Sequence, residues 1–214
     1  MRKPLLTRFH LLLLGVLVSL TATAFVKVPA AAGLPVHWGL DGKPDQIWPR
    51  DEALWVFPGV AAVLVILFLA IGQFAPEDQI KGGRPVIETA IAGLLGLCCA
   101  MQFAFILLGI GSDIDLIRVI TTLLALIFTG LGLALPRSRP NVYAGIRLPW
   151  TMQDARNWQA THRLTGALMV VAGVALGAVA LLWPTPADML IAVGLAVFLP
   201  ILMGGVFSFL YARR

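Results

Sequence analysis

Long apolar runs separated by short polar segments dominate the chain. The runs lie at residues 9–26, 53–74, 87–110, 116–135, 164–183 and 188–211. A helix needs about 20 apolar residues to cross the hydrocarbon core of a bilayer, and each run is close to that length. The pattern therefore predicts an all-α, polytopic membrane protein with six transmembrane helices.

The first run has two interpretations. It is preceded by basic residues, and Ala22-Thr23-Ala24 has the small-x-small form of a signal-peptide cleavage site. A run of about 18 residues is long for the apolar region of a signal peptide but adequate for a span. An uncleaved first helix is the favoured hypothesis, and a cleaved leader is the alternative.

The composition supports a membrane location. Charged residues make up 13% of the chain, about half of the ~25% that is usual in soluble domains. The net charge is +5, but the basic residues lie at the ends of the apolar runs. Membrane orientation explains that placement, so we expect no direct nucleic-acid partner.

The distribution of basic residues predicts the orientation. With a cytoplasmic N-terminus, four of the 16 Lys and Arg residues face outward, which leaves 12 inside. The outward four are Lys27, Lys43, Arg50 and Arg118. The positive-inside rule therefore predicts a multi-pass protein of the cytoplasmic (inner) membrane with both termini in the cytoplasm.

This orientation also defines the predicted regions. Residues 1–75 form an N-terminal membrane domain whose loop, residues 29–52, faces outward. Residues 87–214 form a second helical region, in which the segment 136–163 is cytoplasmic. Residues 76–85 form a short polar loop between the two regions.

The predicted spans lack ionisable residues in their interiors. Gln102 is the most polar side chain near a midplane, and we expect it to form one interhelical hydrogen bond. Proton-coupled transporters generally need buried charged or titratable groups, so this composition argues against proton-coupled transport. Cys98 and Cys99 are interpreted as small buried hydrophobic residues, and Gly173 and Gly177 as sites of close helix packing within the chain.

The longest polar interruption in the second half is NVYAGIRLPWTMQDARNWQATHR, residues 141–163. Its first part lies between Pro140 and Pro149 and is predicted to be non-helical. Thr151 and Asp154 have the spacing of a capping box, which predicts a helix that begins at Met152 and continues into the fifth span.

Trp158 and His162 are four residues apart, so they share one face of that helix. Trp158 is expected at the level of the lipid headgroups, as are Arg156 and Arg163. Arg147 has no comparable anchoring role. We predict that Arg147, with Asn141 and His162, forms a cytoplasmic polar cluster where a partner or a helix end docks.

The outer loop contains a candidate polar site. Residues 34–38 are predicted to be extended, and Asp41-Gly42 to form a turn. His37, with Asp41 and Asp45, could bind a metal ion or pair electrostatically. A metal site usually needs three or four ligands, and no further His or Cys lies on this side. We therefore predict neither metal nor cofactor, and interpret these residues as shaping the loop or recognising a peptide.

The cytoplasmic segment resembles the SdpI family of bacterial membrane proteins. The resemblance rests on Asn141, Gly145-x-Arg147, Trp150 and Trp158-x-x-x-His162-Arg163. It covers the fourth and fifth spans and the segment between them. The family commonly has threonine after the arginine, where this chain has Leu148. The outer-loop sequences LPVHW and GKPD, from residues 34 and 42, are similar to an associated N-terminal membrane domain of unknown function.

The resemblance implies immunity to a secreted antimicrobial peptide toxin, and signalling. Its implied partners are an extracellular peptide toxin and a cytoplasmic repressor, in addition to the membrane lipid that the apolar runs predict. The predicted inner site comprises Asn141, Gly145, Arg147, Trp150, Trp158, His162 and Arg163. The predicted outer site comprises His37, Trp38, Asp41, Gly42 and Asp45.

Three other functions stay open at this point. One is a small-molecule transporter or channel. Another is an enzyme at the membrane interface, with His162, Arg147 and Asp154 as its candidate residues. The third is a structural scaffold. The sequence contains no recognisable nucleophile–base pair, so we predict no catalytic residue.

Overall fold

Six long helices form the body of the protein in a computed structural model that describes residues 4–39, 41–182 and 185–213. They are α1 (Arg8–Lys27), α3 (Val56–Phe74), α4 (Glu77–Gly109), α5 (Leu116–Ala134), α7 (Ala155–Leu182) and α8 (Pro186–Tyr211). Each has the length and apolar composition to cross a membrane, with the five-residue α2 (Arg50–Leu54) leading into α3. The prediction of a six-helix polytopic membrane protein is confirmed.

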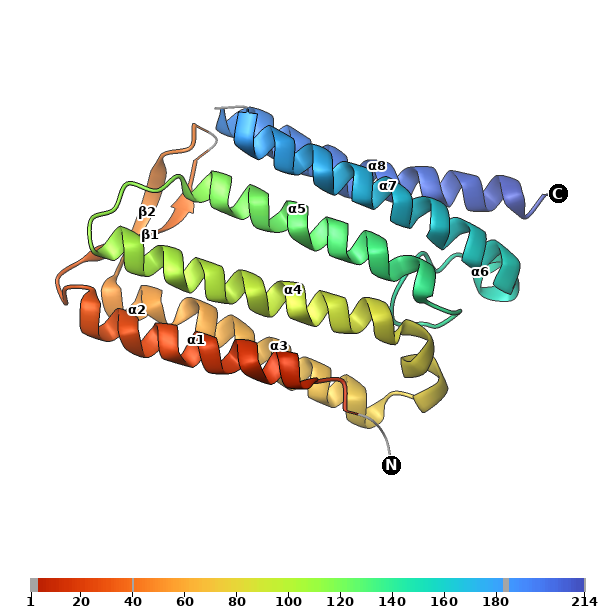
Figure 1. Ribbon diagram of the computed structural model, residues 1–214, viewed down its shortest axis with the longest axis horizontal. Helices are drawn as coiled ribbons and strands as arrows, with labels where there is room; N and C mark the ends of the chain where they lie inside the picture. The colour runs from red at the N-terminus through yellow and green to blue at the C-terminus, as the bar shows by residue number, and fades with distance from the viewer. Residues whose placement is uncertain (1–3, 40, 183–184, 214) are drawn as a thin grey trace.

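The long helices run side by side in a slab (Figure 1). Helices α4 and α5 lie in the middle; α1 and α3 pack on α4, whereas α7 and α8 pack on the α5 side. The start of α1, the end of α8 and the segment between α5 and α7 lie at one end of the slab, which we call the terminal end. The two predicted polar regions therefore lie at opposite ends, while the assignment of the terminal end to the cytoplasm stays a prediction.

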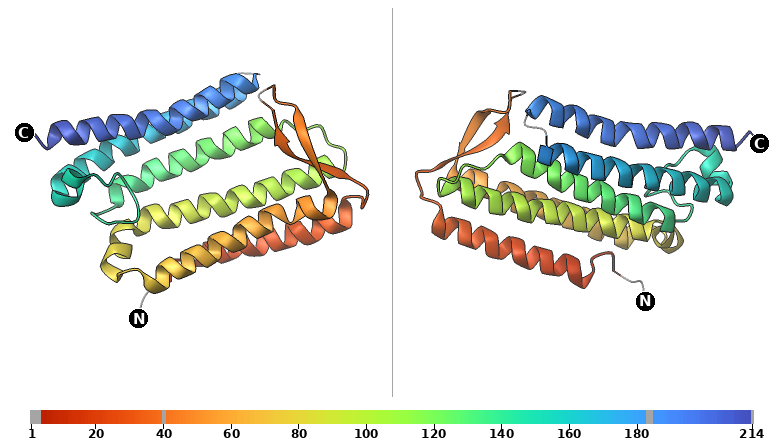
Figure 2. Two further views of the ribbon diagram at one scale, coloured as in Figure 1. Left: turned by 180° about the vertical axis from the view of Figure 1, so that it is seen from behind. Right: turned by 45° about the horizontal axis from the view of Figure 1, so that its top comes forward.

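The opposite end carries a β-hairpin. Strands β1 (Gly33–Trp38) and β2 (Pro44–Pro49) pair antiparallel, with Leu34 opposite Trp48. The extended segment expected at residues 34–38 is confirmed, and its partner strand was not predicted. Figure 2 shows the hairpin crossing the end of the slab from the side of α3 to the start of α8.

The residues between the second and third spans differ from the prediction. Helix α4 begins at Glu77, so the polar loop expected at residues 76–85 is wrong and most of it is helical. Lys81 pairs with Glu77 and Arg84 with Glu88, both at 2.8 Å and four residues apart. Such pairs stabilise an exposed helical turn, and the helix continues through Pro85 although proline donates no amide bond.

Two predictions about helix packing are confirmed. The Gln102 amide nitrogen donates to the Leu54 carbonyl oxygen at 3.2 Å, which is the expected single interhelical bond. A Cβ atom at Gly173 would lie 2.4 Å from the Thr129 hydroxyl oxygen, so this glycine brings α7 against α5 within one chain. A Cβ atom at Gly177 would lie at an ordinary contact distance, 3.7 Å from the Ala125 side chain.

Candidate functional site

The segment at the terminal end begins after a short 3-10 turn, η1 (Leu135–Arg137), and contains one short helix, α6 (Pro149–Gln153). We call residues 138–148 the inner loop. Asp154 has an extended conformation and separates α6 from α7, which begins at Ala155. The expected single helix from Met152 into the fifth span is therefore wrong.

The predicted capping box also fails. The Thr151 hydroxyl group is buried, accepts from the Leu148 amide at 2.9 Å, and lies 2.8 Å from the Ile146 carbonyl oxygen, to which it donates. It is used to fold the chain before α6. The Asp154 carboxylate instead accepts from the Arg156 amide at 2.8 Å, so Asp154 caps the start of α7.

Trp158 and His162 form the centre of this region. Their rings stack with centroids 4.0 Å apart and an interplanar angle of 17°, which confirms that they share a face. Both side chains are fully buried, so the expected headgroup position of Trp158 is wrong. The indole N–H donates to the Ser138 hydroxyl at 3.2 Å, because the inner loop folds back over this face of α7.

The hydrogen bonds of His162 determine its tautomer. Its Nε2 atom accepts from the Ile146 amide at 2.9 Å, so the ring proton lies on Nδ1 and is donated to the Trp158 carbonyl oxygen at 2.7 Å. The ring is therefore a neutral bridge between α7 and the inner loop. Gly145 lies against it at φ +113°, and a Cβ there would be 2.3 Å from Nε2.

Asn141 fastens the other half of the inner loop. Its amide nitrogen donates to the carbonyl oxygens of Arg139 (2.8 Å) and Ala144 (3.1 Å). Its amide oxygen accepts from the amides of Tyr143 (2.9 Å) and Ala144 (2.8 Å). The side chain is fully buried, and its four hydrogen bonds to the backbone fix the conformation of the turn.

The remaining predicted inner residues are more accessible. Arg147 is exposed, and its guanidinium group donates to the Val142 carbonyl oxygen. Arg163 is exposed on α7. Trp150 packs edge-on against Phe209 of α8, with ring centroids 5.4 Å apart. The structure thus places Arg147 on the same loop as Asn141 and directly after Ile146, which bonds to His162. Of Asn141, Arg147 and His162, only Arg147 is exposed.

A second buried network next to this region was not predicted. Asn157 of α7 donates from its amide nitrogen to the Ser208 carbonyl oxygen at 2.9 Å, and its oxygen accepts from the Ser208 and Thr161 hydroxyls. All three side chains are fully buried. The network joins α8 to α7. The four-residue spacing of Asn157 and Thr161 was the sequence signal from which it could have been predicted.

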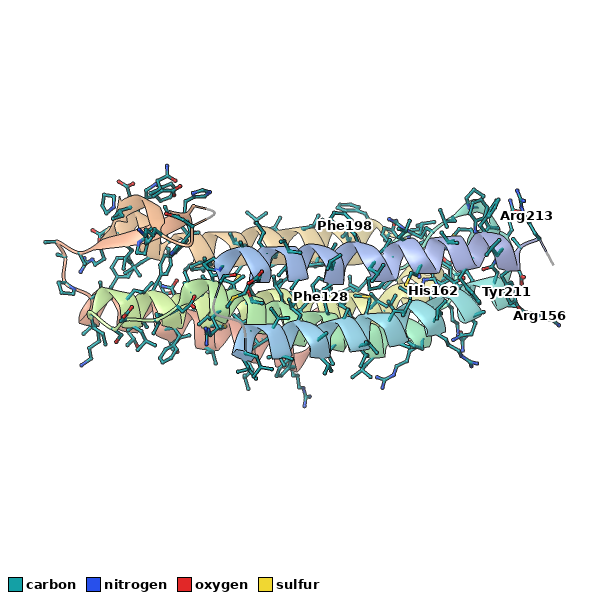
Figure 3. All side chains as sticks on the ribbon, turned by 90° about the horizontal axis from the view of Figure 1, so that it is seen from above. Phe128, Arg156, His162, Phe198, Tyr211 and Arg213 are labelled. Atoms are coloured by element: carbon teal, nitrogen blue, oxygen red, sulfur yellow. The ribbon has the colours of Figure 1, made fainter. Side chains whose placement is uncertain are left out.

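In Figure 3, His162 lies deeper along the bundle than Arg156 and Arg213, which lie at its end.

The predicted outer site lies on the hairpin. The His37 ring and the Asp45 carboxylate are 2.6 Å apart across the two strands, and their side chains are 65% and 52% exposed. The predicted turn is confirmed, with Gly42 at φ +78° and the Asp41 carboxylate accepting from the Lys43 amide at 3.1 Å. Among the described residues, no three His, Cys, Asp or Glu side chains gather closely enough to hold a metal ion.

Gly42 and Trp38 connect the hairpin to the helices. A Cβ at Gly42 would lie 2.4 Å from the Pro186 ring at the start of α8. Trp38 helps to line a hollow of about 290 Å³ together with residues of α5 and α8. These two residues of the predicted outer site therefore anchor the hairpin tip, whereas His37 and Asp45 are presented on its surface.

Comparison with known protein families gives a match in the C-terminal part of the chain, which includes the inner loop. Residues 137–212 match the SdpI/YfhL protein family. The match includes the inner loop, α6, α7 and α8, so it begins after the fourth span and extends through the sixth, further along than the expected resemblance.

A curated relative was also found. The immunity protein SdpI of Bacillus subtilis (strain 168) is 21% identical over 140 residues, which is 65% of this chain and 65% of the relative. The alignment thus spans slightly less than two thirds of the relative's length. No solved structure matches the chain.

Proposed function

We propose, from the premise that this chain is an SdpI-family membrane protein, that it protects the cell that makes it against a secreted antimicrobial peptide toxin. The observation that supports this most directly is the family match of residues 137–212 together with a relative that is named an immunity protein. The six-helix fold with polar surfaces at both ends is compatible with a protein that meets a peptide at the membrane.

In this proposal the hairpin meets the toxin. Strand β2 is exposed along its whole length, with Ile47 and Trp48 among its exposed apolar side chains. His37 and Asp45 add polar groups on the same hairpin. An extended two-stranded surface with apolar and polar groups suits the binding of a peptide chain. Residues 1–75, which carry the hairpin, would form the recognition domain.

The second part of the proposal concerns relay to the cytoplasm. Arg147 is exposed at the terminal end beside Val142 and Tyr143, which are also exposed. A guanidinium group presents five donors in a plane, which suits carboxylate or carbonyl groups of a partner. We propose that this surface docks a cytoplasmic partner such as a repressor, and that Asn141 and His162 act by holding the loop that carries Arg147.

The geometry gives less support to the alternatives. An enzyme would need His162 as a base, but both ring nitrogens are hydrogen-bonded to the backbone and the side chain is fully buried. Asp154 is engaged as a helix cap. A transporter would need polar groups along a path, and Gln102 near the midplane is packed and bonded to Leu54.

A complementation assay tests the proposal. The gene is deleted, and the strain is challenged with secreted peptides from its own and neighbouring strains. Loss of resistance in the deletion strain, restored by the intact gene, is expected. Unchanged resistance to every peptide would contradict the immunity function.

Variants at Arg147 test the relay within the same assay. Arg147→Ala should abolish immunity or signalling at normal protein levels, and Arg147→Lys should rescue poorly because lysine keeps the charge without the planar donor array. Arg156→Ala, an exposed cation at the same end, is the matched control and should behave as wild type. Full function of the lysine variant would reduce Arg147 to a headgroup anchor.

A further inference from the structure

A polar pocket at the terminal end is lined by no residue of the inner loop. It has a volume of about 570 Å³ and opens between the start of α1, the first turns of α4 and η1. Its lining includes three cations, Lys81, Arg84 and Arg137, and one carboxylate, Glu88. The predicted inner site contains none of these residues, and the family match over residues 137–212 includes only Arg137 among them.

The pocket changes in polarity along α4. Lys81, Pro85, Glu88 and Ala92 recur on one face of the helix. From Lys81 to Ala92 this face extends about 16 Å at 1.5 Å per residue. That length covers the headgroup layer, about 5–8 Å deep on each side of a bilayer, and the beginning of the acyl region. The basic end is outermost, and Ala92 lies toward the middle of the helix.

Most of the charges in the pocket are already compensated. Arg84 pairs with Glu88 and Lys81 with Glu77, each at 2.8 Å. Arg137 is exposed and forms no ion pair with any residue that the structure describes. The pocket with its paired groups therefore has one uncompensated positive charge, the charge that a single phosphodiester neutralises.

His10 lines the pocket as an uncharged residue that joins α1 to α4. Its Nδ1 atom accepts from the Thr7 amide at 3.0 Å, so the proton lies on Nε2 and is donated to the Glu88 carbonyl oxygen at 3.0 Å. The buried neutral ring thus fixes the start of α1 against α4. The Thr7 hydroxyl accepts from the His10 amide, which leaves its proton available to a ligand oxygen.

We propose that this pocket binds one anionic phospholipid, with the phosphodiester at Arg137 and Lys81 and an acyl chain descending past Phe9 and Ala92. Phe9 is 57% exposed on the side of α1 that borders the pocket. Basic pockets between transmembrane helices are suited to anionic headgroups. A net charge of +1 favours a headgroup with a net charge of −1, such as phosphatidylglycerol, over a zwitterionic one.

Native mass spectrometry of the full-length protein in detergent tests the site. Phosphatidylglycerol should bind about tenfold more tightly than phosphatidylethanolamine or phosphatidylcholine, and millimolar inorganic phosphate should not displace it. Arg137→Gln should weaken phosphatidylglycerol binding about tenfold, as expected for one charge-assisted hydrogen bond. Arg213→Gln, an exposed cation that follows α8 and lies outside the pocket, is the control and should bind like wild type.

A second variant tests the acyl part without changing charge. Ala92→Phe should fill the lower pocket and also weaken phosphatidylglycerol binding, while the unfolding temperature of the lipid-free protein shows that the fold is intact. Equal binding of all three lipids, displacement by inorganic phosphate, or undiminished binding in both variants would each overturn the proposal.

Discussion

The inner loop and the hairpin are both polar excursions from the helix bundle, but they are held by different means. The inner loop is fixed by three buried side chains, each of which forms a hydrogen bond with the backbone of the loop. They are Asn141, Thr151 and His162. The hairpin is fixed by strand pairing, by buried Leu34 and by Arg50, which donates to the Val28 carbonyl oxygen at 2.9 Å. Its polar side chains remain on the surface.

The buried residues of the inner loop therefore act as a scaffold, whereas the polar residues of the hairpin form a surface. Substitutions of the buried inner residues should first lower the stability of the terminal end, because buried groups that lose a partner are costly. Substitutions on the hairpin surface should leave stability nearly unchanged and alter only what the hairpin binds. The following four predictions test the contrast between the inner loop and the hairpin, in location and then in stability, from the largest expected effect to the smallest.

The largest effect is an all-or-none difference in location. Reporter fusions placed after Asp45, on the hairpin, and after Asp154, between α6 and α7, should report opposite sides of the membrane, because these positions lie at opposite ends of the slab. A periplasmic reporter should be active at the first position only. The same side for both would refute the six-span topology.

Trp158→Ala should cause the largest loss of stability. The indole is fully buried and stacked on His162, and removing such a side chain from a core costs about 3–5 kcal/mol. Thermal unfolding in detergent measures the change. Trp48→Ala on the hairpin is the matched control, with an expected change within about 0.5 kcal/mol, as is usual at surfaces. Equal losses of stability in the two variants would contradict the difference between the buried inner residues and the exposed hairpin.

Gly145→Ala should be the next most harmful change. The residue has φ +113°, and the added methyl group would meet the His162 ring. Strain at such a backbone position costs about 1–3 kcal/mol, before any displacement of the ring. Gly194→Ala in α8, where a Cβ meets nothing within 4 Å, should cause no loss. A stable Gly145→Ala variant would show that the inner loop is adaptable.

Asp45→Asn should have the smallest effect on stability. The His37–Asp45 pair is more than half exposed, and exposed ion pairs contribute at most about 1 kcal/mol. The unfolding temperature should therefore change little. If the hairpin meets the toxin, the same variant should lower immunity in the complementation assay. A large loss of stability without any loss of immunity would assign the pair to the scaffold.

Much of the fold could be predicted from the sequence because apolar run length determines which segments can span a bilayer. The extension of α4 was missed because residues 76–85, which begin and end with proline, were interpreted as a polar loop. The signals for helix were nevertheless present, since Glu77 and Lys81, like Arg84 and Glu88, have the four-residue spacing of helical ion pairs. The helical spacing of these ion pairs and the helix-breaking tendency of Pro85 pointed to different structures, and the segment is helical.

The candidate site was harder to predict. A tryptophan near the end of a span suits the headgroup layer and the protein core equally well, and Trp158 lies in the core because the inner loop covers it. Thr151 has the spacing of a cap, but its hydroxyl is engaged by Ile146 and Leu148 before the helix begins. Both outcomes depend on tertiary contacts that no local sequence pattern contains.

The attachment points of the inner loop also dictate when it can form during biosynthesis. The Arg139 amide donates to the Gly82 carbonyl oxygen of α4 at 2.9 Å, and the Ile146 amide donates to His162 of α7. The loop precedes α7 in the chain, so it emerges from the ribosome before one of its two supports exists. Its final shape must therefore await membrane insertion of α7, and the surface around Arg147 is completed late in assembly.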